Sequence, residues 1–208
     1  MLTELEHDAL TELANMGVGR AAAGLSRMVA ELVQLSVPLI ELLGAEEVAR
    51  RMGARDPAAF VAVREGFNGG FPGHALLLFP EANSLELVRA VVGPDPSLEE
   101  VADLEQEALA EVGNVILNGF LGTIANLLRR RMDISLPEVL RGPAEALFGL
   151  PEPDGRPESL VLFLTVDFVV RSRDIRGYIA VLMNFESLSA LQAVVQEFVV
   201  RLSGEGPP

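Results

Sequence analysis

Two short stretches carry the same polar pair within patterns that predict helices. LTELANMGVG, residues 10–19, contains Glu12 and Asn15, and ALAEVGNVIL, residues 108–117, contains Glu111 and Asn114. Residues three apart in a helix are neighbours on its surface. An amide has an acceptor and donors in one plane and can orient a water, while a carboxylate can pair with a lysine or arginine of a docked molecule. Neither group is a good nucleophile, so the pair fits a device inserted into another molecule's active site.

The two pairs belong to an internal repeat. They lie 99 residues apart, and each asparagine is followed, after 22 intervening residues, by a proline, Pro38 or Pro137. Three landmarks at one offset indicate a duplication, and the spacing is longer than that of solenoid repeats. The sequence therefore predicts two tandem half-domains.

Each half has the pattern of helix, strand, helix, strand, strand and helix. The expected helices are 4–33, 45–52, 82–92, 98–131, 143–149 and 187–202, and the expected strands are 37–43, 58–67, 73–80, 134–140, 159–170 and 177–185. We expect an α+β fold with a pseudo-two-fold axis, in which long helices pack on a β-sheet. Residues 1–208 form one domain with half-repeats 1–96 and 97–203, and 204–208 are expected to be a flexible tail.

Each long helix is expected to carry a polar stripe opposite its apolar face, because residues advance by about 100° each along a helix. The first stripe consists of Asp8, Glu12, Asn15 and Gly19, and the second stripe consists of Glu107, Glu111, Asn114 and Asn118. A single exposed glutamate is ordinary, and duplication alone would copy a meaningless asparagine. An asparagine in mid-helix is less ordinary, because its side chain competes for backbone hydrogen bonds. Close packing between helices accounts for Gly17 and Gly24, whereas Gly19 leaves room for another molecule.

Composition narrows the classes of partner. The chain has 16 basic and 30 acidic residues, a net charge of −14, and no cysteine. Such an acidic surface disfavours nucleic acid and anionic membranes, and the missing cysteines exclude disulfides and thiolate chemistry. The most apolar run, 159–170, is too short for a membrane helix, and the N-terminus is unlike a secretory signal. We expect a soluble, cytoplasmic protein whose partner is another protein.

Other candidate sites are weak. His7 and His74 are the only histidines and show no ligand spacing, so a metal or acid–base role is not expected of either. The glycine-rich segment 64–73 lacks the Lys-Ser/Thr ending of a phosphate loop and lies between strands, which predicts a hairpin turn.

The motif resembles that of the CheC/CheX/FliY phosphatases, which dephosphorylate CheY-type response regulators in chemotaxis. In that pattern, Asp or Ser precedes the Glu of Glu-x-x-Asn by four positions, and 22 residues separate the asparagine from a proline. The first copy matches throughout; the second has Glu107 at the Asp/Ser position. Two motifs in a chain of this length resemble CheC better than CheX, and the lack of a switch-protein domain makes FliY a poorer match.

The resemblance implies an enzyme and a mechanism. Asn15 and Asn114 would orient the attacking water on the regulator's aspartyl phosphate, and Glu12 and Glu111 would contact its active-site lysine. The regulator would supply Mg²⁺, so the chain needs no cofactor of its own.

The resemblance also assigns supporting roles and a second class of function. Asp8 and Glu107 would support the glutamates or the rim, and Pro38 and Pro137 would fix the chain as it enters a strand. CheC-like proteins also bind the receptor deamidase CheD, so a CheD-like protein is a second expected partner. The alternative function is a non-catalytic scaffold or adaptor, since the switch protein FliM has a similar central fold without the catalytic pair.

Overall fold

The computed structural model describes residues 3–29, 32–56, 59–69, 71–92, 98–149, 160–170 and 173–203. The helices are α1 (Glu4–Val29), α2 (Ala45–Arg55), α3 (Glu81–Val92), α4 (Leu98–Leu127), α5 (Ala144–Phe148) and α6 (Phe185–Ser203). The strands are β1 (Val33–Gly44), β2 (Phe60–Asn68), β3 (Gly73–Pro80), β4 (Asp133–Ile134), β5 (Glu138–Gly142), β6 (Leu160–Val170) and β7 (Arg173–Met183). The predicted α+β fold is confirmed, and the predicted tail, 204–208, and the predicted boundary near 96–97 lie outside the described residues.

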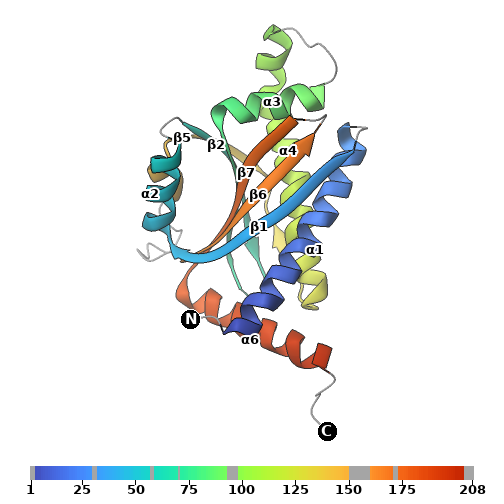
Figure 1. The fold of residues 1–208 in the computed structure, drawn as a ribbon, viewed down its shortest axis with the longest axis vertical. Coiled ribbons are helices and arrows are strands. Elements are labelled where there is room, and N and C mark those ends of the chain that lie inside the picture. The colour runs from blue at the N-terminus through green and yellow to red at the C-terminus, as the bar shows by residue number, and fades with distance from the viewer. Residues whose placement is uncertain are drawn as a thin grey trace.

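One antiparallel sheet takes strands from both halves (Figure 1). Its order is β1-β6-β7-β3-β2, with β4 and β5 both pairing with β2. Strands β1, β2 and β3 of the first half correspond to β5, β6 and β7 of the second half. When each strand in the order β1-β6-β7-β3-β2-β5 is replaced by its counterpart, the result is the same order in reverse. Each half therefore covers a strand edge that the other half would leave unpaired: β1 pairs with β6, and β5 pairs with β2.

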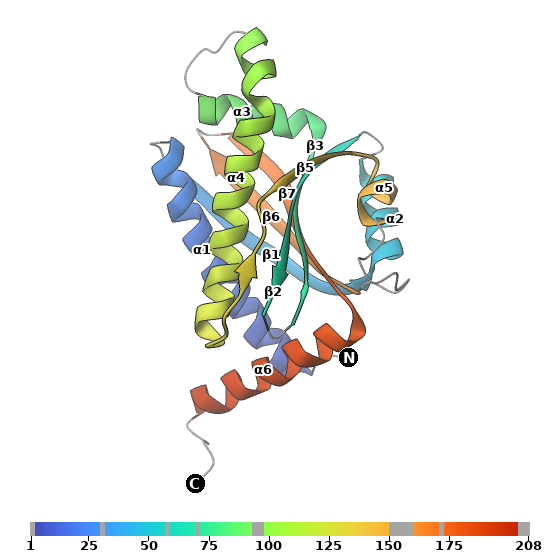
Figure 2. The same cartoon turned by 180° about the vertical axis from the view of Figure 1, so that it is seen from behind.

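Helices cover both faces of the sheet. Figure 2 shows α1 and α4 side by side on one face and the short α2 and α5 on the other. The strands alternate between these layers: Val61 and Val63 face the α1/α4 core, while Phe60 and Ala62 face the α2/α5 core. Helices α3 and α6 lie at opposite ends of the molecule (Figure 1).

Small residues let α1 and α4 approach closely. A Cβ on Gly17 would lie 3.0 Å from the Phe120 ring, and one on Gly24 would lie 2.9 Å from a methyl of Val115. The packing role predicted for both glycines is confirmed. The stretch Leu104–Leu127 of α4 is long and apolar enough to cross a membrane, but 56% of its apolar window is buried inside the protein. This apolar stretch of α4 contributes to the core of the protein.

The ends of the long helices differ from the prediction. Helix α1 ends at Val29, before the predicted 33, and the Val33 N–H at the start of β1 donates to Ser26 Oγ at 2.9 Å. Helix α4 ends at Leu127, before the predicted 131. Arg129 adopts a φ of 54°, and the Arg130 N–H bonds back to the carbonyl of Ala125, which closes the helix.

The predicted strand 134–140 is two strands. Residues 135–137 separate β4 from β5, and Pro137, which has no N–H to donate, lies at the end of this break. The Gly66 N–H donates instead to Ser135 Oγ at 2.8 Å. The turn predicted within 64–73 is confirmed, because β2 and β3 pair as an antiparallel hairpin.

Candidate functional site

The first stripe lies on the solvent side of α1. Asp8, Glu12, Asn15 and Gly19 are all exposed. Leu13 and Val18, on the other side of the helix, are buried in the core against the sheet and α4. The amphipathic pattern therefore determines which side chains of α1 remain available to a visiting molecule.

A capping box holds the start of α1. The Thr3 N–H donates to Glu6 Oε2 at 2.8 Å, and the Glu6 N–H donates to Thr3 Oγ1 at 3.3 Å. Gln196 of α6 also donates to the Glu6 carboxylate. The hydrogen bond from the Thr3 N–H, with the one from Gln196, holds the pKa of Glu6 below its usual value. The charged carboxylate thus ties α6 to the first turn of α1, directly before Asp8.

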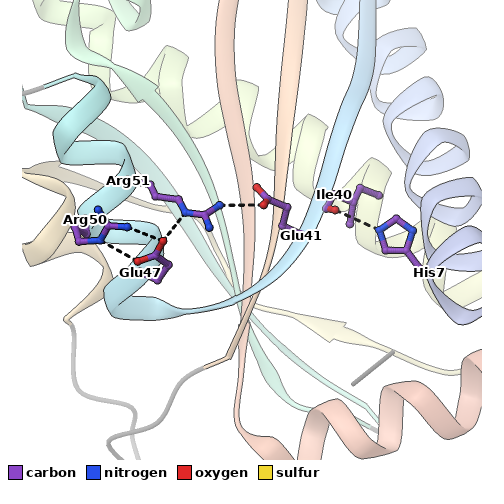
Figure 3. A network of polar contacts seen from close by, with 6 residues as sticks. All are labelled: His7, Ile40, Glu41, Glu47, Arg50 and Arg51. Atoms are coloured by element: carbon purple, nitrogen blue, oxygen red, sulfur yellow. Dashed lines mark hydrogen bonds and ion pairs between the residues drawn. The ribbon is translucent and has the colours of Figure 1, made fainter. Parts of the chain in front are cut away.

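His7 holds α1 against the sheet. Its ring nitrogen Nε2 lies 3.3 Å from the Ile40 carbonyl of β1 and is the donor of that hydrogen bond (Figure 3). On the next residue of β1, Glu41 pairs with Arg51 at 2.9 Å, and Arg51 also pairs with Glu47 of α2. His7 therefore has a structural role, and this chain of contacts fixes β1 between α1 and α2.

The second stripe is more recessed. Glu107 and Glu111 are exposed on α4, but Asn114 and Asn118 are only half-exposed. Asn118 Nδ2 donates a hydrogen bond to Asn114 Oδ1 at 2.5 Å. The Asn114 carbonyl oxygen therefore has one partner inside the protein and one lone pair left over.

Close contact with the sheet fixes the position of Asn114. The adjacent residue, Gly113, lies so near β2 that a Cβ there would be 2.3 Å from a methyl of Val63. Only glycine allows this approach, so α4 is held at one rotation about its axis. Asn114, the next residue, is then directed away from the sheet contact.

The two prolines occupy related places in the sheet. Pro38 lies in β1, where the pairing with β6 shifts register between Ser36 and Leu39. Pro137 comes directly before β5, at the entry into a strand, whereas Pro38 lies inside β1. Pro137 also reaches the second stripe, because it lines an open hollow together with Glu107, Gln106, Ala110, Glu138 and Val139.

The carboxylates of both stripes have no partners within the part of the chain that the structure describes. Among the described residues, none forms an ion pair or hydrogen bond with the side chains of Asp8, Glu12, Glu107 or Glu111. Nor do three His, Asp or Glu side chains within the described ranges come together so that they could bind a metal ion. The stripes offer free carboxylates and amides, which suit a cationic group and a water.

Two features escaped the sequence analysis. The sequence predicts Asn118 on the second stripe but does not by itself predict its hydrogen bond to Asn114. The feature that could have indicated this bond is a second amide one helical turn after the first. Glu65 of β2 is fully buried, and neither carboxylate oxygen has a hydrogen-bond partner. The sequence could have indicated this burial, because Glu65 shares one face of the strand with Val61, Val63 and Phe67, and that face is apolar. Burial raises the pKa of Glu65 to about 7.

A second hollow lies at the β2–β3 hairpin, away from the predicted site residues. Phe67, His74, Asp133, Ser135 and Asn184 are among its lining residues. It contains no residue of either stripe, so it lies apart from both Glu-x-x-Asn pairs.

No family model matches the chain. Curated proteins do: the CheY-P phosphatase CheC of Bacillus subtilis is 27% identical over 66% of this chain and 67% of its own length. The putative CheY-P phosphatase CheC1 of Halobacterium salinarum is also 27% identical, over 74% of this chain and 78% of its own length.

Solved structures share the fold. FliY of Thermotoga maritima matches with a TM-score of 0.74 and 18% identity, over 97% of this chain and 98% of the other. The FliM middle domain of Vibro alginolyticus has a TM-score of 0.64 and 11% identity, over 89% and 99%. The CheX–CheY–BeF3–Mg²⁺ complex from Borrelia burgdorferi contains a chain with a TM-score of 0.51 and 17% identity, over 81% and 96%. The resemblance seen in the motifs is thereby confirmed in both sequence and fold: the chain is similar in sequence to proteins named CheC and in fold to FliY.

Proposed function

We propose that this protein dephosphorylates the aspartyl phosphate of a CheY-like response regulator in the cytoplasm, using the pairs Glu12–Asn15 and Glu111–Asn114. One observation carries the proposal: two helices present the same pair on a polar stripe whose carboxylates have no partners among the described residues. The relatives named CheY-P phosphatase support this substrate class. A protein substrate also suits a net charge of −14, which disfavours nucleic acid.

The reaction needs little from the phosphatase. Water attacks phosphorus in line, the bond from phosphorus to the aspartyl oxygen breaks, and the electron pair returns to the aspartate as a carboxylate. The water proton leaves with inorganic phosphate or passes to solvent. In such transfers most of the catalysis is positioning and charge stabilisation.

The asparagines would supply the positioning. An amide oxygen that accepts a hydrogen bond from the water directs the remaining lone pair of the water at phosphorus. Holding one water in line is worth on the order of 10²-fold in rate, with no covalent intermediate. The regulator itself would bring Mg²⁺, which is also present in the CheX–CheY complex, and the chain would need no cofactor of its own.

The glutamates would supply the docking contact. Glu12 and Glu111 are exposed and free to pair with the regulator's active-site lysine, which holds each helix in register over the phosphoryl group. Asp8 and Glu107, one helical turn earlier, would form the acidic rim. The prolines would act on the scaffold: Pro137 borders the hollow next to Glu107, and Pro38 shapes β1.

A scaffold is the second candidate, because FliM middle domains share this fold. In that case the chain would bind a receiver domain or a CheD-like deamidase without hydrolysis. Binding that persists while no phosphate is released would favour the scaffold.

The deciding experiment removes both amides. Asn15→Ala/Asn114→Ala should bind the phosphorylated receiver but lose acceleration of phosphate release by about 10²-fold. The matched control is Asn126→Ala, which removes an exposed asparagine of α4 outside the stripe. Thermal unfolding checks that all variants fold. A double variant that keeps the wild-type rate would overturn the proposal.

A further inference from the structure

The two stripes differ at the position that follows each asparagine by one helical turn. In α1 this position is Gly19, and in α4 it is Asn118, at the same offset of 99 residues that relates Asn15 to Asn114. Residues four apart on a helix are neighbours, so each of these positions can touch its asparagine. The difference therefore lies within reach of both amides.

The consequences for the two amides are opposite. In the second stripe Asn118 Nδ2 donates to Asn114 Oδ1, and both residues are half-buried. In the first stripe a Cβ on Gly19 would meet no atom within 4 Å. Among the described residues nothing forms a hydrogen bond with the exposed Asn15 side chain. Asn114 is therefore oriented by its own helix, whereas Asn15 can rotate and exchange its two ends.

We propose that Asn118 is a positioning residue for the second site, because it orients the Asn114 amide before the regulator docks. This inference rests on the function proposed above. The bond uses one lone pair of Asn114 Oδ1 and directs the amide plane. The second lone pair remains for the attacking water. The first site has no such residue and orders Asn15 only when the regulator arrives.

An amide that is already oriented loses less conformational freedom in the docked complex. The gain should appear in kcat, since Asn118 contacts Asn114 and not the partner. The net value of one hydrogen bond corresponds to a roughly three- to tenfold change in rate. The kcat of the second site should exceed the kcat of the first site by about this factor.

The test separates the sites and then exchanges their neighbours. In an Asn15→Ala background, where only the second site works, Asn118→Leu keeps the shape of the side chain but removes the donor. We expect kcat to fall roughly three- to tenfold with KM nearly unchanged. In an Asn114→Ala background, Gly19→Asn should raise kcat by a similar factor over Gly19→Ala. Alanine is the control because it gains more helix propensity than asparagine but has no amide, so a higher kcat with asparagine cannot come from helix propensity.

A second readout does not depend on activity. NMR relaxation of the side-chain amide groups should show Asn114 more ordered than Asn15, and Asn118→Leu should remove that difference. Equal order in the wild type, or an unchanged kcat in both exchanges, would overturn the role of Asn118. If neither single-site background accelerates phosphate release, the proposed function fails, and the NMR result still decides whether Asn118 orders Asn114.

Discussion

The first and second stripes show how a duplicated motif diverges by its surroundings. Both carry Glu-x-x-Asn, with carboxylates that have no partner in the described ranges of the chain. Asn15 stands exposed beside the open Gly19, while Asn114 is half-buried, bonded to Asn118 and next to a glycine pressed on the sheet. The groups that would do chemistry are the same, and the groups that hold them are not. Orientation of the amides, not their identity, distinguishes the two sites.

The comparison extends to the strands beneath the helices. Glu65 and Leu164 are 99 residues apart and both fully buried; Glu65 pairs with Ala75 of β3, and Leu164 pairs with Ile179 of β7. Both point toward the layer of α1 and α4. One half thus places leucine where the other places a carboxylate without a hydrogen-bond partner. Because a buried carboxylate without a hydrogen-bond partner is unfavourable, Glu65 should lower the free energy of unfolding relative to a leucine at the same position.

The largest effect is expected from copying the leucine into β2. Burial raises the pKa of Glu65 from 4.5 to about 7 in the folded protein, so between these values the folded chain binds more protons than the unfolded chain. Stability from Glu65 is therefore greatest below pH 4.5 and is lost as pH rises toward 7. At about pH 8, Glu65→Leu should raise the free energy of unfolding by roughly 3 kcal/mol more than at low pH, measured by urea unfolding across pH.

The control for this change is Glu65→Gln, which keeps a polar side chain but does not titrate. The leucine and glutamine variants should show parallel stability curves from pH 4.5 to 7, while the wild type falls away from both. A wild-type curve parallel to the two variants would show that folding does not raise the pKa of Glu65.

The next effect concerns three glycines of the two long helices. Gly113→Ala places a Cβ 2.3 Å from Val63, so we expect destabilisation of about 1–2 kcal/mol after the gain in helix propensity. Gly19→Ala and Gly122→Ala meet nothing within 4 Å and should be stabilising, by up to about 1 kcal/mol. Thermal unfolding of the three variants tests this; equal shifts would mean that α4 does not need its close approach to β2.

Much of this arrangement was predictable from the sequence. Periodicity located the helices, and strand 73–80 was placed without error, because an apolar run bounded by turn residues leaves little choice. The shared offset located both stripes, since the duplication supplied an internal comparison within one chain.

The remaining features depend on contacts between distant segments. The break at 135–137 was missed because an apolar run with one proline also fits an edge strand, and only the pairing of Gly66 with Ser135 separates the two. The lack of a hydrogen-bond partner for Glu65 depends on which residues surround it in the folded protein. The close approach of Gly113 to Val63 likewise depends on how α4 packs on the sheet. Local propensity carries no information on either.

A smaller effect is expected when one site is removed at a time. If the second site is three- to tenfold faster, Asn114→Ala should leave about 10–25% of the phosphatase rate, and Asn15→Ala should leave most of it. Phosphate release from a phosphorylated receiver, with each variant at equal concentration, measures both. Equal losses from the two variants would show that the stripes are equivalent despite Asn118.

The smallest effect concerns the carboxylates, for which the two stripes should behave alike. Glu12 and Glu111 are both exposed, and neither has a partner among the residues that the structure describes, so each would form a solvent-exposed ion pair with the receiver. Such pairs contribute about 0.2–1 kcal/mol, so Glu12→Gln and Glu111→Gln, each with the other site inactivated, should raise KM by at most about fivefold. The increase should vanish at about 1 M salt, where exposed charges are screened. If one glutamine variant loses far more than the other, the stripes differ in how they dock, and the asymmetry would not be confined to the amides.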